Sequence, residues 1–384
     1  MICINAKTKT RKYPVYMGNG AIKDAPGIIC SIFKSAEKIL LVTDDNVHRL
    51  YSANIEKMLA DTGKQSKTVV IENGEGSKNL ENTRMLYEEM MAFNMHRNDL
   101  AVAFGGGVTG DLTGFAASTF HRGIYLLQFP TSIIAQVDSS IGGKVVVNHG
   151  GTKNIIGSFY QPHAIVADYG LLETLDEKEV KNGLAEIIKY GLVFDKKILS
   201  GLISIGGRDC SISSVKSIIS GPGFDEIISK CIKIKLNVVH IDEFDTGYRN
   251  LLNFGHTAGH ALEKISRLGN ISHGIAVSWG ILVAIDISTG AGLLAGDYLK
   301  DMVVDLYKKM KIPVKLALDE LPGKQSATDA ASEIYSAMKF DKKFTSTRNR
   351  FVLLKGLNRP VIVDNINEEI ITEAILKNIA GEKK

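Results

Sequence analysis

LAVAFGGGVTGD, residues 100–111, joins an apolar run to a turn rich in glycine. The run Leu100–Phe104 contains no polar residue, which is typical of a strand buried on both faces of a parallel sheet. Gly105–Gly107 then lead toward a helical pattern over Leu112–Phe120. Glycines in this position let backbone N–H groups approach a phosphate at the start of a helix. The stretch therefore favours a nucleotide-binding turn, and an ordinary tight turn is the alternative.

Similar apolar runs occur on both sides of this stretch. Each is rich in branched residues, and helical patterns such as Leu80–Phe93 separate several of them. Alternation of strands and helices predicts an α/β domain with a mainly parallel, Rossmann-like sheet and helices on its faces. The other expected strands are Ile39–Thr43, Val69–Ile71, Ile124–Phe129 and Ala164–Ala167.

The pattern changes after about Leu175, where helical spacing begins to dominate. Strand signals return only at Phe351–Lys355 and Val361–Asp364, and Ser204–Gly223 has the composition of a loop. We therefore expect two domains: a nucleotide-binding α/β domain over residues 1–175 and a mainly α-helical domain for metal and substrate over residues 176–384. The expected helices of the second domain are Asp176–Phe194, Phe224–Asp242, His256–Leu268, Gly274–Leu294 and Ala327–Met338.

Composition excludes several classes of protein. The chain of 384 residues is 45% hydrophobic and 23% charged, and its formal net charge of +4 is small for a nucleic-acid binder. The four cysteines form no C-x-x-C pair, which argues against a disulfide framework or a cysteine zinc site. The longest apolar stretch, Gly274–Ile285, is short for a membrane span, and the N-terminus lacks the pattern of a signal peptide. We expect a cytoplasmic protein that binds neither nucleic acid nor membrane.

The nucleotide site departs from the standard dinucleotide fingerprint. That fingerprint places an acidic residue about 20 positions after the glycines, whereas no acidic residue lies between Asp111 and Asp138 here. An earlier expected strand is followed by Asp44, Asp45 and Asn46, where a carboxylate can accept hydrogen bonds from a ribose. The order of parts predicts a variant of the dinucleotide fold.

Histidines and one carboxylate suggest a metal site. His256 and His260 lie four residues apart, so both imidazoles would share one helix face, and His273 follows. Glu186 is the best candidate carboxylate, because an apolar helix seldom carries Glu with Lys189 one turn later unless both face a polar site. Imidazoles with a carboxylate suit zinc and leave one coordination position open. The alternative is that two of the three histidines are ordinary helix or cap residues.

Several cationic residues stand beside Gly, Asn or Asp, outside plain amphipathic runs. Singly, each is typical of a solvated surface charge, whereas together they can bind an anionic substrate. They are Lys144, Lys153, Lys235, Arg249, Lys342 and Lys343.

From about residue 40 to about residue 355 the chain resembles the 3-dehydroquinate synthases, which are sugar phosphate cyclases. The resemblance rests on the joint order of many motifs. They are Gly105–Asp111, Gln136–Lys144, Lys153–Asn154, Phe159–Pro162, Gly183–Gly191, Asp242–Glu243, Arg249, Asn253–His260 and Asp341–Lys343.

The resemblance implies two cofactors, NAD in the N-terminal domain and Zn²⁺, or Co²⁺, in the helical domain. It implies Glu186, His256 and His273 as the metal ligands, which makes His260 a substrate contact although spacing alone pairs it with His256. The NAD contacts that it implies are Asp44, Asn46, Glu75, Lys78, Gly105, Gly106, Gly107, Asp111, Thr131, Ser132, Lys144 and Lys153.

The resemblance also implies substrate contacts and a homodimer. Lys189 and Asp138 match residues that contact substrate hydroxyls, and Lys235 with Arg249 matches a carboxylate pocket. Arg122 matches an arginine that reaches the phosphate bound by the neighbouring subunit. The phosphate pocket is matched by Lys144, Asn154, Asn253, His260 and Lys342.

The implied reaction is a redox-neutral cyclisation in the shikimate pathway, which leads to the aromatic amino acids. It converts 3-deoxy-D-arabino-heptulosonate 7-phosphate, a small sugar phosphate, into 3-dehydroquinate and phosphate. NAD takes hydride from carbon 5, phosphate leaves by β-elimination, the hydride returns, and an intramolecular aldol step closes the ring. The metal would polarise two adjacent hydroxyls, and the cofactor performs the hydride chemistry.

The chain departs from the family pattern at three places. Residues 148–154 read NHGGTKN, where the family usually has proline after the histidine, Ile275 stands at a usual glutamate, and Ala258 replaces a larger residue. Three other functions remain: a sibling cyclase for another sugar phosphate, a metal-dependent alcohol dehydrogenase of the glycerol dehydrogenase type, and a non-catalytic interaction protein. The dehydrogenase would leave the anion-binding lysines without a purpose.

Overall fold

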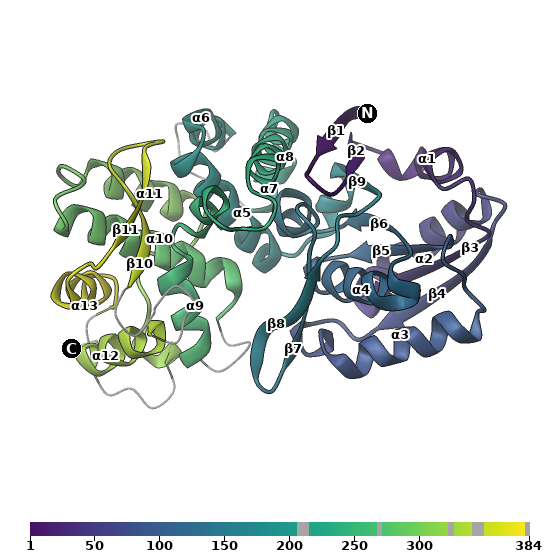
Figure 1. The fold of residues 1–384 in the computed structure, drawn as a ribbon. Coiled ribbons are helices and arrows are strands. Elements are labelled where there is room, and N and C mark those ends of the chain that lie inside the picture. The colour runs from purple at the N-terminus through teal and green to yellow at the C-terminus, as the bar shows by residue number, and fades with distance from the viewer. Residues whose placement is uncertain (206–214, 267–270, 322–325, 340–348, 381–384) are drawn as a thin grey trace. The chain divides into compact units, whose positions relative to one another are not determined.

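The computed structural model describes all residues except 206–214, 267–270, 322–325, 340–348 and 381–384. The chain forms two compact units: unit 1 comprises Met1–Leu175 and Cys231–Phe244, and unit 2 comprises Asp176–Lys230 and Asp245–Lys384. The division at Cys231 falls inside one helix, α8 (Phe224–Ile241) (Figure 1). Sequence patterning assigns Cys231–Phe244 to the helical domain, because nothing in a continuous helix marks the change of unit.

Unit 1 is built on a seven-stranded sheet in the order β1-β2-β9-β6-β5-β3-β4. The five strands expected from sequence are all present and pair in parallel, which confirms the predicted fold class. An unexpected antiparallel hairpin, β1–β2, extends one edge, where β2 pairs with β9 in parallel. The strands are β1 (Ile2–Lys7), β2 (Lys12–Gly18), β3 (Lys38–Asp44), β4 (Gln65–Ile71), β5 (Leu100–Gly105), β6 (Tyr125–Pro130) and β9 (Ala164–Asp168).

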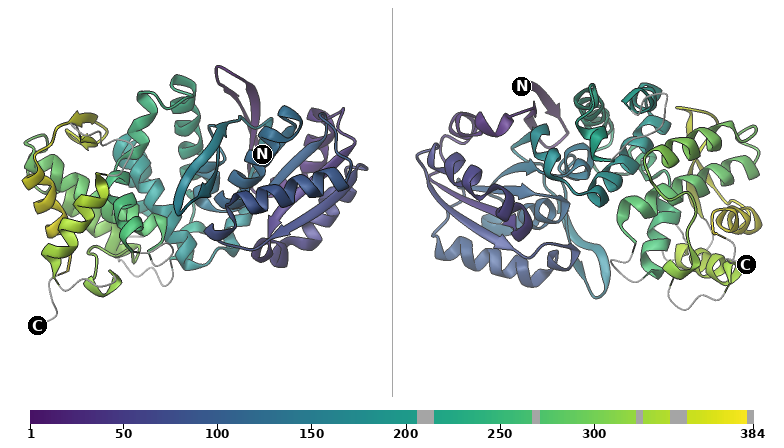
Figure 2. Two further views of the ribbon diagram at one scale, coloured as in Figure 1. Left: turned by 60° about the horizontal axis from the view of Figure 1, so that its bottom comes forward. Right: turned by 180° about the vertical axis from the view of Figure 1, so that it is seen from behind.

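Helices cover both faces of this sheet (Figures 1 and 2). Ile39 and Leu41 belong to the core under α1 (Ala25–Ile32) and α2 (Asp45–Ala60). Leu40 and Val42, which alternate with them, belong to the core under α3 (Leu80–Ala92) and α4 (Gly107–Thr119). Burial on both faces is why these strands are continuous apolar runs in the sequence. A second hairpin, β7 (Lys144–His149) with β8 (Thr152–Phe159), contributes Val145 and Val147 to the core with α4.

The strand order creates a switch point between β3 and β5. β3 pairs with β4 on one side and with β5 on the other: the crossover after β3 leads to β4, and the crossover after β4 returns past β3 to β5. Ligands of open α/β sheets bind outside the carboxyl ends of the strands at such a point. Asp44 ends β3 and Gly105 ends β5, so both flank this position. The helix after the glycines starts at Gly107, five residues earlier than the sequence pattern indicated, so Asp111 lies within α4.

The described residues of unit 2 are mainly helical and include a small antiparallel pair, β10 (Arg350–Leu354) and β11 (Pro360–Asp364). The expected loop Ser204–Gly223 contains a short helix, α7 (Lys216–Ile219), and part of it lies outside the described residues. The remaining helices are α5 (Glu177–Val193), α6 (Lys196–Ile205), α9 (His256–Ile265), α10 (His273–Gly290), α11 (Tyr298–Lys309), α12 (Ala327–Met338) and α13 (Glu368–Lys377).

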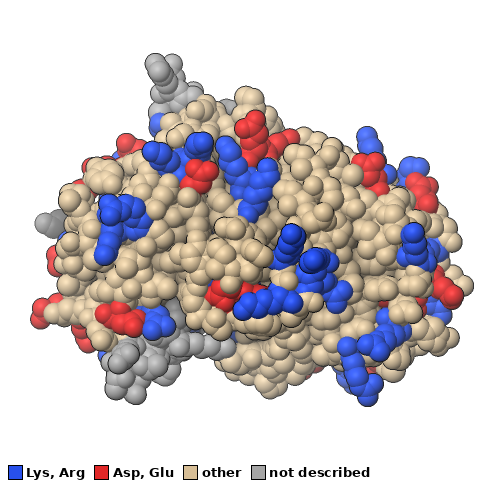
Figure 3. All heavy atoms as spheres, turned by 45° about the horizontal axis from the view of Figure 1, so that its top comes forward, with Lys and Arg blue, Asp and Glu red and all other residues tan. Residues whose placement is uncertain are grey.

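Two surface properties bear on the function classes. Among the described residues, α10 alone has the length and apolar character to cross a membrane, and 72% of its 18-residue window is buried in the protein, as in a core helix. On the face drawn in Figure 3, basic and acidic side chains are interspersed, in keeping with the small formal net charge of +4.

Candidate metal and nucleotide sites

The metal candidates of unit 2 come from three helices that pack closely. Glu186 lies in the fully buried half of α5, and His256 and His273 are the first residues of α9 and α10. Ser272 donates a hydrogen bond to Asn182 on α5 at 2.6 Å, and a Cβ at Gly274 would meet the Asn182 carbonyl oxygen at 2.5 Å. The start of α10 is therefore held against α5, one turn before Glu186.

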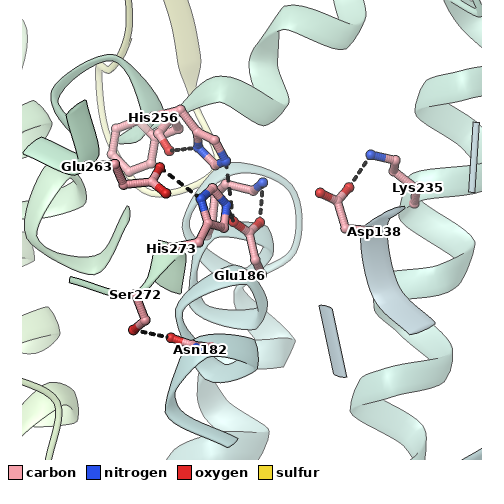
Figure 4. Close-up of polar contacts among 10 residues, drawn as sticks. Asp138, Asn182, Glu186, Lys235, His256, Glu263, Ser272 and His273 are labelled. Atoms are coloured by element: carbon pink, nitrogen blue, oxygen red, sulfur yellow. Dashed lines mark hydrogen bonds and ion pairs between the residues drawn. The ribbon is translucent and has the colours of Figure 1, made fainter. Parts of the chain in front are cut away.

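The two imidazoles present their Nε2 atoms to one carboxylate oxygen (Figure 4). Nε2 of His256 lies 3.3 Å from Oε1 of Glu186, and Nε2 of His273 lies 3.6 Å from it. Nδ1 of His256 contacts the Phe254 carbonyl at 3.2 Å, and Nδ1 of His273 contacts the Glu263 carboxylate at 3.2 Å. Metal-binding histidines are oriented in this way by partners at the second ring nitrogen.

Charges and burial around Glu186 shift several pKa values. Glu186 is 0% exposed, which opposes its ionisation, but its ion pair with Lys189 and its contact with His256 hold the pKa of the carboxyl well below its ordinary value. Burial and the Lys189 charge lower the pKa of His256 to about 4, so its imidazole is neutral and can coordinate. The pKa of His273 is raised: burial opposes the charge, but contacts with Glu186 and Glu263 outweigh it. A divalent cation would take the place of the His273 proton.

The donor atoms fall into two overlapping groups, in each of which they lie within 4.8 Å of one another: Glu186, His256, His273 and His260, Glu263, His273. The first group fits a metal better, because the Nδ1 contact of His273 with Glu263 directs Nε2 toward Glu186. His260 is exposed and lies one turn along α9 from His256. Helix spacing alone pairs His256 with His260, whereas in the structure the Nε2 atoms of His256 and His273 both face Glu186.

Three other sequence-predicted residues of unit 2 lie on α5 and on the segment before α9. Lys189 is 1% exposed and lies one turn from Glu186 on α5. Arg249, 3% exposed, and Asn253 lie on the short helix η6 (Tyr248–Asn253) directly before α9. Lys342, with the neighbouring Lys343, lies outside the described residues.

In unit 1 the glycine turn lies at the switch point of the sheet. A Cβ at Gly105 would lie 2.5 Å from Oγ1 of Thr109, which is too close for a side chain, and one at Gly107 would make a tight contact of 3.2 Å with Oγ of Ser139. Thr131 and Ser132 follow the next strand, β6, and the Thr131 N–H donates to the Gly105 carbonyl at 3.0 Å. The turn and the end of β6 therefore meet at one edge of the sheet.

Asp44 also caps α2, because its Oδ1 accepts a hydrogen bond from the Val47 N–H at 2.9 Å. Burial raises the pKa of the Asp44 carboxyl. Asn46 lies exposed in the first turn of α2, where its side-chain oxygen accepts from Arg49 at 2.8 Å.

A partly buried ionic network includes Asp111 of α4, the helix that follows the glycine turn. Lys78, 5% exposed, pairs with Glu75 at 3.1 Å and with Asp111 at 3.2 Å. Burial raises the pKa of Asp111 to about 6, although the Lys78 charge opposes that shift. The side chain of Asn148, on β7, donates to Glu75 at 2.9 Å and accepts from the Asn154 N–H at 2.8 Å. Asn148 thus connects this network to the β7–β8 hairpin.

The anion-binding candidates of unit 1 lie on separate elements. Lys235 on α8 forms an ion pair with Asp138 in the π-turn Ala135–Ser139 (Figure 4). Lys144 is exposed at the start of β7, and Lys153 and Asn154 lie at the start of β8. Arg122 is exposed and has a left-handed backbone with φ of 63°.

Sequence reasoning did not assign a role to Glu263 or Asn148. Glu263 follows His256 by seven residues and His260 by three, so helical spacing places it on the same face of α9. That spacing could have identified it. Asn148 offered no comparable signal, because its contacts with Glu75 and Asn154 depend on a hairpin that the sequence did not predict.

Comparisons with known proteins agree over most of the chain. The family model "3-dehydroquinate synthase N-terminal" matches residues 68–182, and "3-dehydroquinate synthase C-terminal" matches residues 183–344. The 3-dehydroquinate synthase of Desulforamulus reducens is 37% identical over 358 residues, which is 93% of this chain and 95% of the relative.

Two solved structures share the fold. One is 2-epi-5-epi-valiolone synthase from Streptomyces hygroscopicus subsp. jinggangensis with NAD⁺ and Zn²⁺ bound, with a TM-score of 0.83 at 25% identity over 97% of this chain and 98% of that one. The other is 2-deoxy-scyllo-inosose synthase complexed with carbaglucose-6-phosphate, NAD⁺ and Co²⁺, with a TM-score of 0.79 at 22% identity over 98% of this chain and 100% of that one. The family models and the relative show that the chain belongs to the 3-dehydroquinate synthase family.

Proposed function

We propose that the protein is an NAD- and divalent-metal-dependent, phosphate-eliminating lyase that converts 3-deoxy-D-arabino-heptulosonate 7-phosphate into 3-dehydroquinate and phosphate. The observation that carries the proposal is the convergence of two Nδ1-anchored imidazoles on the buried Glu186 carboxylate, in a chain of this family. The relatives carry the name of this activity, and both structural neighbours hold NAD⁺ with a divalent metal.

The residues of unit 2 fit a metal. Both side-chain oxygens of Glu186 are buried; Oε2 pairs with Lys189, and the Nε2 atoms of His256 and His273 face Oε1. Glu186, His256 and His273 would hold Zn²⁺, or Co²⁺, and leave a coordination position open. The metal, when bound, supplies Lewis acidity toward substrate hydroxyls. Lys189 balances the Glu186 charge, and Glu263 orients His273.

The residues of unit 1 fit a dinucleotide. The switch point brings Asp44, the Gly105–Gly107 turn and the end of β6 to one edge of the sheet, and glycines there leave space for a pyrophosphate. Lys78, paired with Glu75 and Asp111, adds a buried cation beside the turn. NAD, when bound, supplies the hydride acceptor. The NAD contacts of the proposal include Asn46, Thr131, Ser132, Lys144 and Lys153.

The substrate contacts follow from charge. The heptulosonate carries a phosphate and a carboxylate at opposite ends, so two cationic pockets are needed. We assign the carboxylate to Lys235 and Arg249, whose planar guanidinium can form two parallel hydrogen bonds. We assign the contacts with the substrate hydroxyls to Asp138 and Lys189. The phosphate contacts of the proposal are Lys144, Asn154, Asn253, His260 and Lys342.

A second candidate function is that of a sibling cyclase, favoured only by the two structural neighbours. Phosphate release from the heptulosonate, glucose 6-phosphate and sedoheptulose 7-phosphate, each with NAD and Zn²⁺, separates the two. Preference for the heptulosonate is the expected result, because the other two leave Arg249 without its anion. Faster release from either of the others would refute the proposed substrate.

Two further properties belong to the proposal. We expect a cytoplasmic homodimer in which Arg122 reaches the phosphate bound by the partner subunit. The exposed position of Arg122 supports a contact with the partner subunit. Sedimentation equilibrium tests the dimer. Mixing the Arg122→Ala variant with a variant inactive at Glu186 tests the shared site. In a hybrid dimer, one site would combine an intact Glu186 with the intact Arg122 of the other chain, so the mixture should release phosphate faster than the average of the two parents.

A further inference from the structure

The proposed function assigns no role to three sequence motifs: Phe159–Pro162, Asp242–Glu243 and the glycine before Lys144. In unit 1 their buried polar groups meet at Glu243, which is 1% exposed and lies just after α8. Glu243 accepts hydrogen bonds from the Lys9 N–H at 2.6 Å, the Thr10 N–H at 3.1 Å and the Thr10 hydroxyl. Its fourth donor is the Gln161 side chain, at 2.8 Å. One carboxylate therefore joins the end of α8, the β1–β2 turn and the segment after β8.

Gln161 extends this network toward Lys144. Gln161 is 3% exposed, and its side-chain oxygen accepts from the Tyr13 hydroxyl at 3.3 Å. A Cβ at Gly143 would lie 2.9 Å from Cδ of Gln161, and the φ of Gly143 is 67°, so only glycine fits against Gln161 here. The Gly143 carbonyl in turn accepts from the Tyr160 N–H at 2.7 Å. The backbone that enters β7 at Lys144 is thus held by the hydrogen bond from Tyr160 and packs against Gln161.

The same carboxylate anchors the helix that carries Lys235. Lys235 lies two turns before Glu243 and pairs with Asp138, and His240 between them contacts the Lys7 carbonyl at 2.9 Å. Burial disfavours an ionised Glu243, but hydrogen bonds from Thr10 and Gln161 outweigh burial and lower its pKa. A charged group with such a complete set of donors holds one geometry more strictly than apolar packing does.

We propose that Glu243 is a positioning residue that fixes the end of α8 and the Gln161–Gly143 contact, and thereby places Lys235 and Lys144 for the anionic substrate. The inference rests on the proposed function, because that function gives Lys235 and Lys144 their roles. It predicts that loss of Glu243 weakens substrate binding through Lys235 in addition to any loss of stability.

Asp99 provides a matched control. It is 3% exposed and accepts hydrogen bonds from the N–H groups of Glu37 at 3.0 Å, Lys38 at 2.9 Å and His96 at 2.7 Å. It lies at the amino ends of β3 and β5, the edge of the sheet opposite to the switch point. Glu243→Ala and Asp99→Ala should both lower the melting temperature. Only Glu243→Ala should raise KM for the heptulosonate, by about tenfold, whereas Asp99→Ala should leave it within twofold of wild type.

A double-mutant cycle tests the route through Lys235. In a Lys235→Ala background, Glu243→Ala should raise KM by a smaller factor than in the wild type, because only its effect through Lys144 remains, whereas independent effects would multiply in full and would overturn the proposal. Equal KM values for Glu243→Ala and Asp99→Ala would overturn it as well. If Glu243→Ala does not fold, the comparison uses Glu243→Gln and Asp99→Asn in place of the two alanine variants. We then expect KM to rise at least threefold in Glu243→Gln and not in Asp99→Asn. Failure of the wild type to release phosphate would refute the proposed function instead.

Discussion

Replacing Glu186 with Gln keeps the shape of the side chain and removes the charge on which the proposed metal site depends. In the structure, Glu186 and Lys189 are 0% and 1% exposed and form an ion pair one turn apart on α5. A glutamine would leave the Lys189 ammonium buried without its counter-charge, which in proteins costs about 3–5 kcal/mol. It would also replace an anionic ligand with a weak neutral one, so bound zinc should fall well below one per chain.

The matched control is an exposed pair with the same charges on another helix. Lys57 and Asp61 on and just after α2 lie 3.4 Å apart with side chains 79% and 50% exposed, and solvent screens such pairs to about 0–1 kcal/mol. Asp61→Asn should therefore change the free energy of unfolding by less than about 1 kcal/mol and leave the zinc content unchanged.

Urea denaturation with a chelator present measures the free energy of unfolding of the metal-free protein. Trp279 is the single tryptophan of the chain and lies on α10 in unit 2, so its fluorescence reports the unit that contains Glu186. Elemental analysis of protein prepared with zinc measures the number of zinc ions bound per chain. A Glu186→Gln variant that loses less than about 1 kcal/mol, or that retains one zinc per chain, would refute both the buried pair and the ligand assignment.

Three further predictions follow from single side chains. Burial lowers the pKa of His163 to about 3, and its Nδ1 accepts from the Leu126 N–H at 3.1 Å. The unfolded chain therefore binds a proton below about pH 6.5 that the folded chain excludes, and the free energy of unfolding should fall by about 1.4 kcal/mol per pH unit from pH 6.5 toward pH 3. His163→Asn should flatten that slope in urea titrations, and an unchanged slope would contradict the burial of a neutral imidazole. His256→Ala should remove most zinc while His260→Ala spares it and lowers turnover; elemental analysis with the opposite order would exclude the ligand set. Arg249→Ala should raise KM for the heptulosonate about a hundredfold, and Arg249→Lys should not restore it, because a point charge cannot replace a planar fork; full recovery in the lysine variant would argue against bidentate carboxylate binding.

The sequence predicted those parts of the fold that burial on both faces makes visible. Ile39–Thr43 and Leu100–Phe104 are continuous apolar runs because helices cover both sides of β3 and β5. The β7–β8 hairpin escaped detection because β8 alternates exposed and half-buried residues and never forms an apolar run. The start of α4 was also missed, because Gly107 and Gly110 lower the helical signal of its first turns.

The candidate site depended more on contacts between distant segments. Spacing on one helix could pair His256 with His260, but it could not bring Glu186 or His273 to His256, since that contact arises from the packing of α5, α9 and α10. Residue types named all three as metal candidates together with His260, and only the family resemblance selected Glu186, His256 and His273 as the ligands. The network at Glu243 likewise joins residues that are more than two hundred positions apart in the chain, at Thr10 and Glu243. No local pattern encodes such a contact.

Hydride that leaves and returns within one turnover produces phosphate without net NADH, and this balance separates the proposed cyclisation from dehydrogenation. The direct measurement combines purified protein with Zn²⁺, the heptulosonate and a limiting amount of NAD, and follows phosphate release together with absorbance at the NADH band. The expected result is many phosphates released per NAD with no lasting rise in NADH absorbance, and no activity when NAD is removed. Accumulation of one NADH per substrate consumed, without phosphate release, would contradict the proposed reaction.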